Sequence, residues 1–160
     1  MSLIEQLIRR KEDRGLMASL RCFLVESKRQ RAWPALNRLN VRIDDVDAGT
    51  VAALFATHSE VAAVGNMGDH CRTLEKLRNE KRTDDAKLTP TERRFQHLLA
   101  ANRSEIHERV GALIRMAKQQ GVAINYEQLL IDLRYWNERT RNDWATHFWT
   151  PNVAQKEEEA

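Results

Sequence analysis

Hydrophobic residues recur along most of the chain at spacings of three and four, which is the period of an amphipathic α-helix. In the first half, Ser2 and Glu5 form a predicted capping box at the start of one helix. Four further helices are predicted in that half: about 16–31, 35–40, one with its apolar face on Val51, Leu54 and Phe55, and one that ends near Lys81.

Start signals for helices are clearest in the second half. Thr89, Pro90 and Glu92 supply an N-cap, a proline in the first turn and the acid of a capping box. The remaining predicted boundaries are a cap at Ser104 before Ile106, a stop at Gly121, a cap at Asn125, and helices over 126–136 and 138–149. Four helices in about 60 residues predict a bundle.

Composition agrees with the helical pattern, because the chain of 160 residues contains only six glycines and three prolines. The segment 82–87 has no apolar residue larger than alanine and is predicted to be a linker. We therefore expect an all-α protein of two small helical bundles, over residues 1–86 and 87–150. Residues 151–160, which end in three glutamates and an alanine, are predicted to form a disordered acidic tail.

Charge is distributed unevenly along the chain. Residues 9–42 contain ten basic and three acidic residues, whereas 43–71 contain five acidic residues and neither lysine nor arginine. Segregated positive charge predicts a surface that faces a polyanion. The candidate nucleic-acid-binding residues are Arg21, Lys28, Arg29, Arg93, Arg94, Arg103, Arg109, Arg115, Arg139 and Arg141. A solvated helix face is the alternative explanation for these side chains.

Helical spacing places Arg21, Lys28 and Arg29 on one face of the predicted helix 16–31. Arg94 is expected beside the buried stripe of its own helix and Arg103 beyond the end of that helix. Both arginines are therefore expected to be free to reach a phosphate, and replacing both with alanine is expected to leave stability nearly unchanged.

No catalytic motif or metal-binding spacing appears in the sequence, so we expect neither an enzyme nor a cofactor. Asp44, Asp45 and Asp47 are interpreted as helix-capping acids, with a metal-dependent nuclease site as the minor alternative. A site formed by His70, Cys71 and distant Cys22 is disfavoured, because adjacent side chains diverge on a helix. The tryptophans are interpreted as core residues in preference to base-stacking platforms.

No segment approaches the ~18 apolar residues that a membrane helix needs, and no signal peptide is recognisable. The two cysteines are 49 positions apart and suggest no disulfide framework. These features predict a cytoplasmic protein with no membrane partner.

Several runs of residues resemble the small subunit, or CasB family, of type I-E CRISPR Cascade complexes. The resemblance covers roughly residues 7–149 and is most specific in the run that begins at Glu92. The runs are Arg14–Arg21, Ala53–Phe55, Asn66–Gly68, Glu92–Arg103 and Tyr126–Trp136.

The resemblance implies a non-catalytic subunit, present in two copies, that supports the R-loop of an RNA-guided complex. It implies as partners the other Cascade subunits, the guide RNA, and the target and displaced DNA strands, with no small-molecule substrate. The basic positions of the family match best at Arg94 and Arg103 and at Arg139 or Arg141, and less securely at Arg21. A helical adaptor that only docks other subunits is the alternative function.

Overall fold

A computed structural model describes residues 1–82, 84 and 87–151. These residues form nine α-helices and two 3-10 helices, with one isolated parallel bridge between Val61 and Ile124, so the all-α prediction is confirmed. The elements are α1 (Leu3–Arg9), α2 (Arg14–Arg21), η1 (Cys22–Leu24), η2 (Glu26–Ala32), α3 (Trp33–Arg38), α4 (Val46–Thr57), α5 (Met67–Leu77), α6 (Pro90–Leu99), α7 (Ile106–Gln120), α8 (Tyr126–Arg134) and α9 (Glu138–Phe148).

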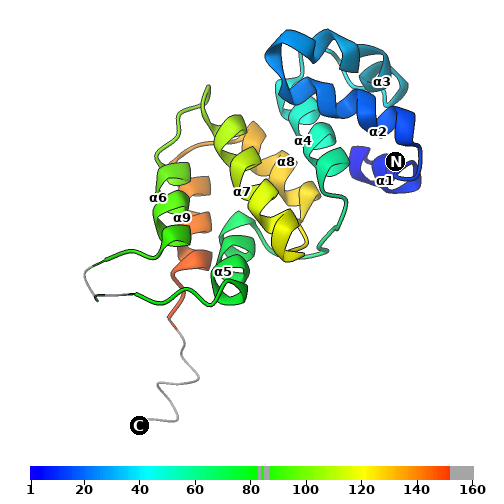
Figure 1. Cartoon of the computed structure of the whole chain (residues 1–160). Helices are drawn as coiled ribbons and strands as arrows, with labels where there is room; N and C mark the ends of the chain where they lie inside the picture. Colours follow the sequence, from blue (N-terminus) through cyan, green and yellow to red (C-terminus); the bar gives the residue numbers. More distant parts are fainter. Residues whose placement is uncertain (83, 85–86, 152–160) are drawn as a thin grey trace.

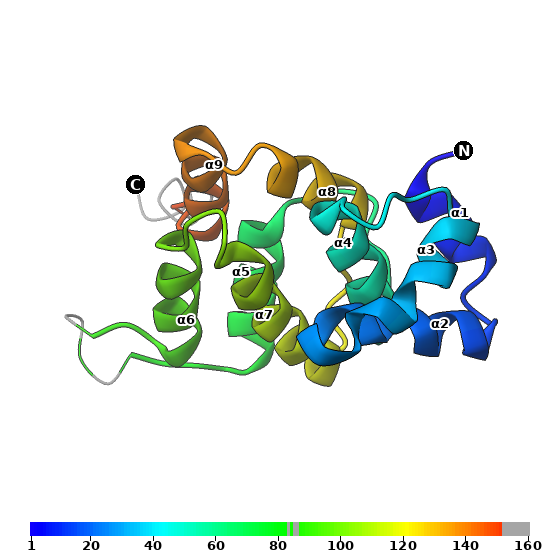
Figure 2. The ribbon, with the colours of Figure 1, turned by 90° about the horizontal axis from the view of Figure 1, so that it is seen from above.

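The α4 helix lies at the centre of this arrangement. It contacts α1, α2 and η1 on one side and α7 and α8 on the other (Figures 1 and 2). Ten consecutive residues of α4, from Asp47 to Ala56, are buried. A helix that is buried around its whole circumference needs apolar residues on every face, which explains why the sequence of α4 is almost continuously hydrophobic.

Two glycines permit close approaches between segments. A Cβ atom at Gly49 of α4 would lie 2.5 Å from the ring of Phe23, and one at Gly68 of α5 would lie 2.0 Å from the carbonyl oxygen of Trp144 in α9. Any larger residue would force the neighbouring segments apart. These glycines therefore set how closely η1 packs on α4 and α9 packs on α5.

The predicted continuous helix over 16–31 is wrong. The α2 helix ends at Arg21, two 3-10 segments follow, and Val25 between them is extended. The packing of Phe23 against Gly49 holds the chain to α4 at this point. Tertiary contact therefore overrides the helix-forming tendency of the sequence.

Most predicted caps are confirmed: Ser2, Asp45, Thr89 and Asn125 each accept a hydrogen bond from the first turn of their helix, and Gly121 ends α7 in the left-handed conformation.

The predicted cap at Ser104 is wrong. Glu105 is the N-cap residue, and the side chain of Asn102 accepts hydrogen bonds from the backbone N–H groups of Ser104 and Glu105. The α5 helix also ends at Leu77, before the predicted Lys81, because Asn79 turns the chain with a φ of 52°. The α8 helix likewise ends at Arg134, two residues before the predicted Trp136.

The prediction that the tryptophans belong to the core is confirmed for Trp136 and Trp144, whereas Trp33 and Trp149 are about two-fifths exposed. The division into bundles over 1–86 and 87–150 stays a prediction. Residues 83, 85 and 86 of the predicted linker and 152–160 of the predicted tail lie outside the described part of the chain. The α5 helix precedes the linker and packs against α6, α7 and α9, which follow it. None of the described helices is long and apolar enough to span a bilayer.

Glu92 is a buried carboxylate that joins three segments. It accepts hydrogen bonds from the Nε and Nη2 atoms of Arg82 at 3.1 and 2.7 Å, from the backbone N–H of Thr89 at 3.0 Å, and from the indole of Trp149 at 2.9 Å. The hydrogen bonds from Arg82 outweigh the effect of burial, and with those from Thr89 and Trp149 they lower the pKa of Glu92 to about 2. The charged form of Glu92 therefore stabilises the fold.

We predict that Glu92→Gln lowers the free energy of unfolding at pH 7 by about 2 kcal/mol, because hydrogen bonds to a charged group are lost. The contribution of Glu92 is fully present above the unfolded pKa of 4.5 and is lost as the pH falls toward about 2. The difference between wild type and variant should therefore shrink over that range in urea denaturation experiments. Glu138→Gln, at an exposed position in α9, serves as the control. A difference that stays constant from pH 7 to about 2.5 would contradict the assignment.

Candidate nucleic-acid interface

Asp47 anchors a network of charged side chains between α4 and α7. Its Oδ1 atom accepts hydrogen bonds from Arg103 Nη1 at 3.0 Å and from His107 Nε2 at 2.7 Å, and its Oδ2 atom accepts from Arg103 Nη2 at 2.7 Å. Arg103 also donates to the carbonyl oxygen of Leu133. The network therefore links α4, the connection before α7, α7 itself and the end of α8.

The carboxylate of Asp47 is charged although it is buried. Burial acts to raise its pKa, but hydrogen bonds from Arg103 and then His107 outweigh that effect and lower it. The same ion pair raises the pKa of Arg103. Only 8% of the Asp47 side chain is exposed, whereas 54% of the Arg103 side chain is exposed. The guanidinium group of Arg103 thus pairs with Asp47, while about half of the Arg103 side chain remains exposed to solvent.

The three aspartates considered for a metal site do not converge. Asp44 pairs with Arg42, Asp45 caps α4 and pairs with Arg134, and Asp47 pairs with Arg103. Throughout the described ranges, no three His, Cys, Asp or Glu side chains are placed to hold a metal ion.

His70 and Cys71 belong to the packing of the helices. The ring of His70 accepts a hydrogen bond from the backbone N–H of Asn125 at 3.0 Å, and its pKa is lowered by burial. Cys71 is buried, which raises the pKa of its thiol.

A groove of about 740 Å³ runs between the N-terminal segments and α7, and we call it the α4–α7 groove. Three of the predicted arginines line it from separate segments: Arg29 from η2, Arg103 from the connection before α7, and Arg115 from α7. Its other lining residues include the polar side chains of Thr50, Ser104 and His107 and the acidic side chains of Glu26 and Glu108.

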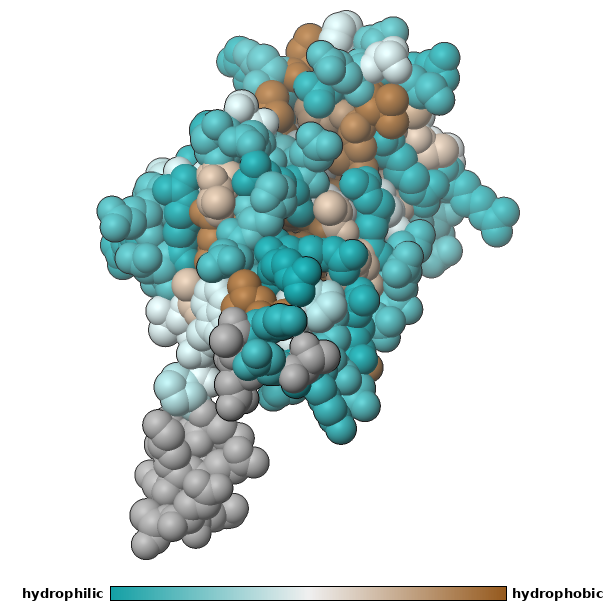
Figure 3. All heavy atoms as spheres, turned by 60° about the vertical axis from the view of Figure 1, so that its left-hand side comes forward, coloured by the Kyte–Doolittle hydropathy of each residue, from teal (hydrophilic) through white to brown (hydrophobic). Residues whose placement is uncertain are grey.

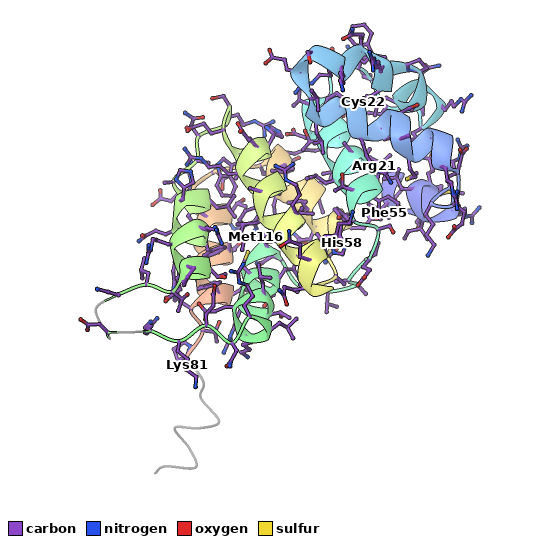
Figure 4. All side chains as sticks on the ribbon, in the orientation of Figure 1. Arg21, Cys22, Phe55, His58, Lys81 and Met116 are labelled. Atoms are coloured by element: carbon purple, nitrogen blue, oxygen red, sulfur yellow. The ribbon has the colours of Figure 1, made fainter. Side chains whose placement is uncertain are left out.

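A second groove of about 620 Å³ lies between α6 and α7, and we call it the α6–α7 groove. It shares Glu108 and Arg115 with the first groove, so the two adjoin. Arg94 and His97 line it from α6, and the side chain of Met116, labelled in Figure 4, belongs to its α7 wall. The remaining lining residues are Glu105, Arg109, Ala112 and Leu113.

Several predicted arginines are engaged by backbone carbonyls. Arg21, labelled in Figure 4, donates to Ala56 at 2.8 Å. Arg29 donates to the carbonyl oxygen of Phe23 at 3.1 Å and lies over the ring of that residue, and Arg93 donates to the carbonyl oxygen of Leu88 at 3.4 Å. Arg109 donates to the carbonyl oxygen of His97 at 2.7 Å and forms an ion pair with Glu105. Arg141 donates to the carbonyl oxygen of Ala101 at 2.9 Å and lies over the ring of Trp136.

Four of the ten candidates are exposed, and their side chains make no hydrogen bond or ion pair with the residues described: Lys28, Arg94, Arg115 and Arg139. The expected common face of Arg21, Lys28 and Arg29 is wrong, because the helix that would create it ends at Arg21. The expectation that Arg103 is free is also wrong. Its partner Asp47 lies 56 positions away, and no sequence spacing indicates that pairing.

The sequence matches the profile of the CRISPR-associated protein Cse2 family over residues 8–149. No curated protein matches it. Several solved structures share the fold. A CRISPR-associated protein of the Cse2 family from Thermus thermophilus has a TM-score of 0.72 and 19% identity, over 93% of this chain and 94% of that one. A structure of CasB from Thermus thermophilus has a TM-score of 0.65 and 21% identity, over 94% of this chain and 100% of that one. The structure of M. ruber CasB has a TM-score of 0.67 and 20% identity, over 100% of this chain and 99% of that one.

We predict that Arg103→Ala lowers the free energy of unfolding by about 2 kcal/mol, because it leaves the buried carboxylate of Asp47 without its main partner. Arg94→Ala removes the same charge from an exposed position and should change stability by no more than about 0.5 kcal/mol. Urea denaturation of both variants at pH 7 measures the difference. Equal stability of the two variants would show that the Asp47 network contributes nothing to the fold.

Proposed function

Because the chain belongs to the CRISPR-associated protein Cse2 family, we propose that it is a non-catalytic, nucleic-acid-binding subunit of an RNA-guided surveillance complex. Two copies act in the cytoplasm beside the other subunits, the guide RNA and the target DNA. The basic surface of the chain holds DNA strands by their backbone and stabilises the R-loop.

The observation that carries this proposal is the meeting of Arg29, Arg103 and Arg115 at the α4–α7 groove. Arg29 lies 74 positions before Arg103 in the sequence, so the fold brings positive charge from distant parts of the chain to one groove. Guanidinium groups form paired hydrogen bonds with phosphate oxygens. A strand bound in the groove would therefore lie near all three cations.

The three arginines differ in how they are held. Arg29 is fixed by the carbonyl oxygen of Phe23 and by the ring beneath it, and Arg103 is fixed by Asp47. The side chain of Arg115 makes no hydrogen bond or ion pair within the part of the chain that the structure describes. Two cations are therefore positioned before a strand arrives, and the third can move to meet it. Lys28 and Arg139 remain further candidates as exposed cations.

Contacts of this kind suit the energetics of an R-loop. Exchange of a DNA duplex for an RNA–DNA hybrid is nearly balanced in free energy, so modest contacts with the displaced strand can favour the open state. Contacts with phosphates add affinity that depends on salt and carries no sequence preference. Base pairing with the guide RNA would then supply the sequence specificity.

We predict that the purified protein binds single-stranded DNA weakly, without sequence preference, and with an affinity that falls steeply as salt is added. Arg29→Gln/Arg115→Gln should weaken this binding and lower the slope of log K against log salt by about 1 to 2, since each phosphate contact on single strands contributes ~0.7. Fluorescence anisotropy between about 50 and 300 mM salt measures both quantities. The assembled complex should form R-loops less efficiently with this variant.

The control is Arg10→Gln/Arg38→Gln, which removes the same charge from exposed positions at the ends of α1 and α3. Equal loss in both double variants would mean that net charge and not the α4–α7 groove governs binding. Binding that ignores salt or discriminates one sequence from its scramble would contradict the proposal. Cleavage of DNA by the purified protein in the presence of Mg²⁺ would contradict its non-catalytic part.

A further inference from the structure

We propose that the α6–α7 groove docks an acidic amphipathic helix of a partner protein. This inference goes beyond nucleic-acid binding, because it assigns a second surface to a second class of macromolecule. It rests on the apolar middle of the groove, on the charges at its rim and on its length.

The middle of the groove is apolar. Ala112 is exposed, Met116 is half-buried, and Leu113 closes the space beneath them. A sugar–phosphate backbone is mostly polar and would cover these side chains poorly. Leucine-like side chains on one face of a helix would cover them and gain from leaving water. Methionine also adapts its shape to different partners, which suits a docking surface.

Two of the charged side chains at the rim of the groove are cations that have no partner among the described residues. Arg94 on α6 and Arg115 on α7 are exposed and make no hydrogen bond or ion pair with described residues. Arg109 is held by Glu105 and by the carbonyl oxygen of His97, so its charge is partly neutralised. Glu108 is the acidic residue left at the rim. Glutamate or aspartate side chains that flank the apolar face of the partner would therefore pair with Arg94 and Arg115.

The length of the groove suits three turns of helix. Its α7 wall extends from Glu105 to Met116, which is about 16 Å at 1.5 Å per residue. An α-helix of about 11 residues has the same length and repeats its apolar positions every three or four residues. The α6 and α7 helices that form the groove pack against each other (Figure 1). On the face drawn in Figure 3, hydrophobic residues reach the surface chiefly in the upper part of the view.

The test uses the full chain and synthetic, fluorescently labelled peptides of about 14 residues, which is long enough to span the groove. One peptide carries leucines at helical spacing and glutamates elsewhere. A second has the same composition in an order that destroys the spacing, and a third has lysine in place of glutamate. We expect the first peptide to bind at least tenfold more tightly than the other two in fluorescence anisotropy at physiological salt.

The diagnostic variant is Ala112→Gln/Met116→Gln, which makes the middle of the groove polar without changing its charge. It should weaken binding of the first peptide at least tenfold and leave the affinity for single-stranded DNA unchanged. Arg94→Gln should weaken binding of the first peptide at least threefold. Ile131→Gln changes an exposed apolar residue of α8 and should leave peptide binding unchanged. Melting curves confirm that the variants remain folded.

Two outcomes would overturn the inference. Equal affinity for the first and second peptides, or equal displacement of both by single-stranded DNA, would make the α6–α7 groove a simple polyanion site. Failure of the first peptide to bind at all would mean that no helix docks there. Neither outcome bears on the α4–α7 groove, whose test measures DNA binding and includes Arg29, which lines that groove and not the α6–α7 groove.

Discussion

The carboxylate of Asp47 lies on a helix that is covered on both sides, and a charge in that position must be neutralised where it lies. Arg103 does this from the connection before α7, and His107 of α7 adds a hydrogen bond. The pairing fixes the connection before α7 against the first turn of α4, and Arg103 extends the contact to the end of α8. The α4–α7 groove exists because these segments are held at this distance.

The need to neutralise buried acids divides the arginines into two groups. Some serve the protein itself: Arg82 holds Glu92, Arg103 holds Asp47, and Arg134 holds Asp45. Others, of which Arg94 and Arg115 are examples, are left to solvent. A count of basic residues along the sequence mixes the two groups. The α4–α7 groove contains members of both groups, because Arg103 holds a buried acid and still presents its outer edge to a ligand.

Local signals in the sequence predict local structure well. The capping boxes at Ser2 and Thr89 and the glycine stop at Gly121 are confirmed because each depends on residues within one turn. The break after Arg21 could not be predicted in the same way, since it depends on Phe23 meeting Gly49, which lies far along the chain. The Asp47–Arg103 ion pair could not be predicted for the same reason, since its two residues are 56 positions apart. The helical pattern and the composition indicated the fold class, and the resemblance indicated the family, but the two grooves required coordinates.

The central position of α4 also has a consequence for synthesis of the chain. Its apolar surface faces α1 and α2, which precede it, and α7 and α8, which follow it, and α8 ends 77 residues after α4. At bacterial elongation rates of roughly 5–20 residues per second, α4 leaves the ribosome on the order of 4–15 s before its last partner. During that interval half of a nearly all-apolar helix is uncovered. The nascent chain therefore passes through a state suited to chaperone capture, although the finished protein buries Asp47 to Ala56 of this helix.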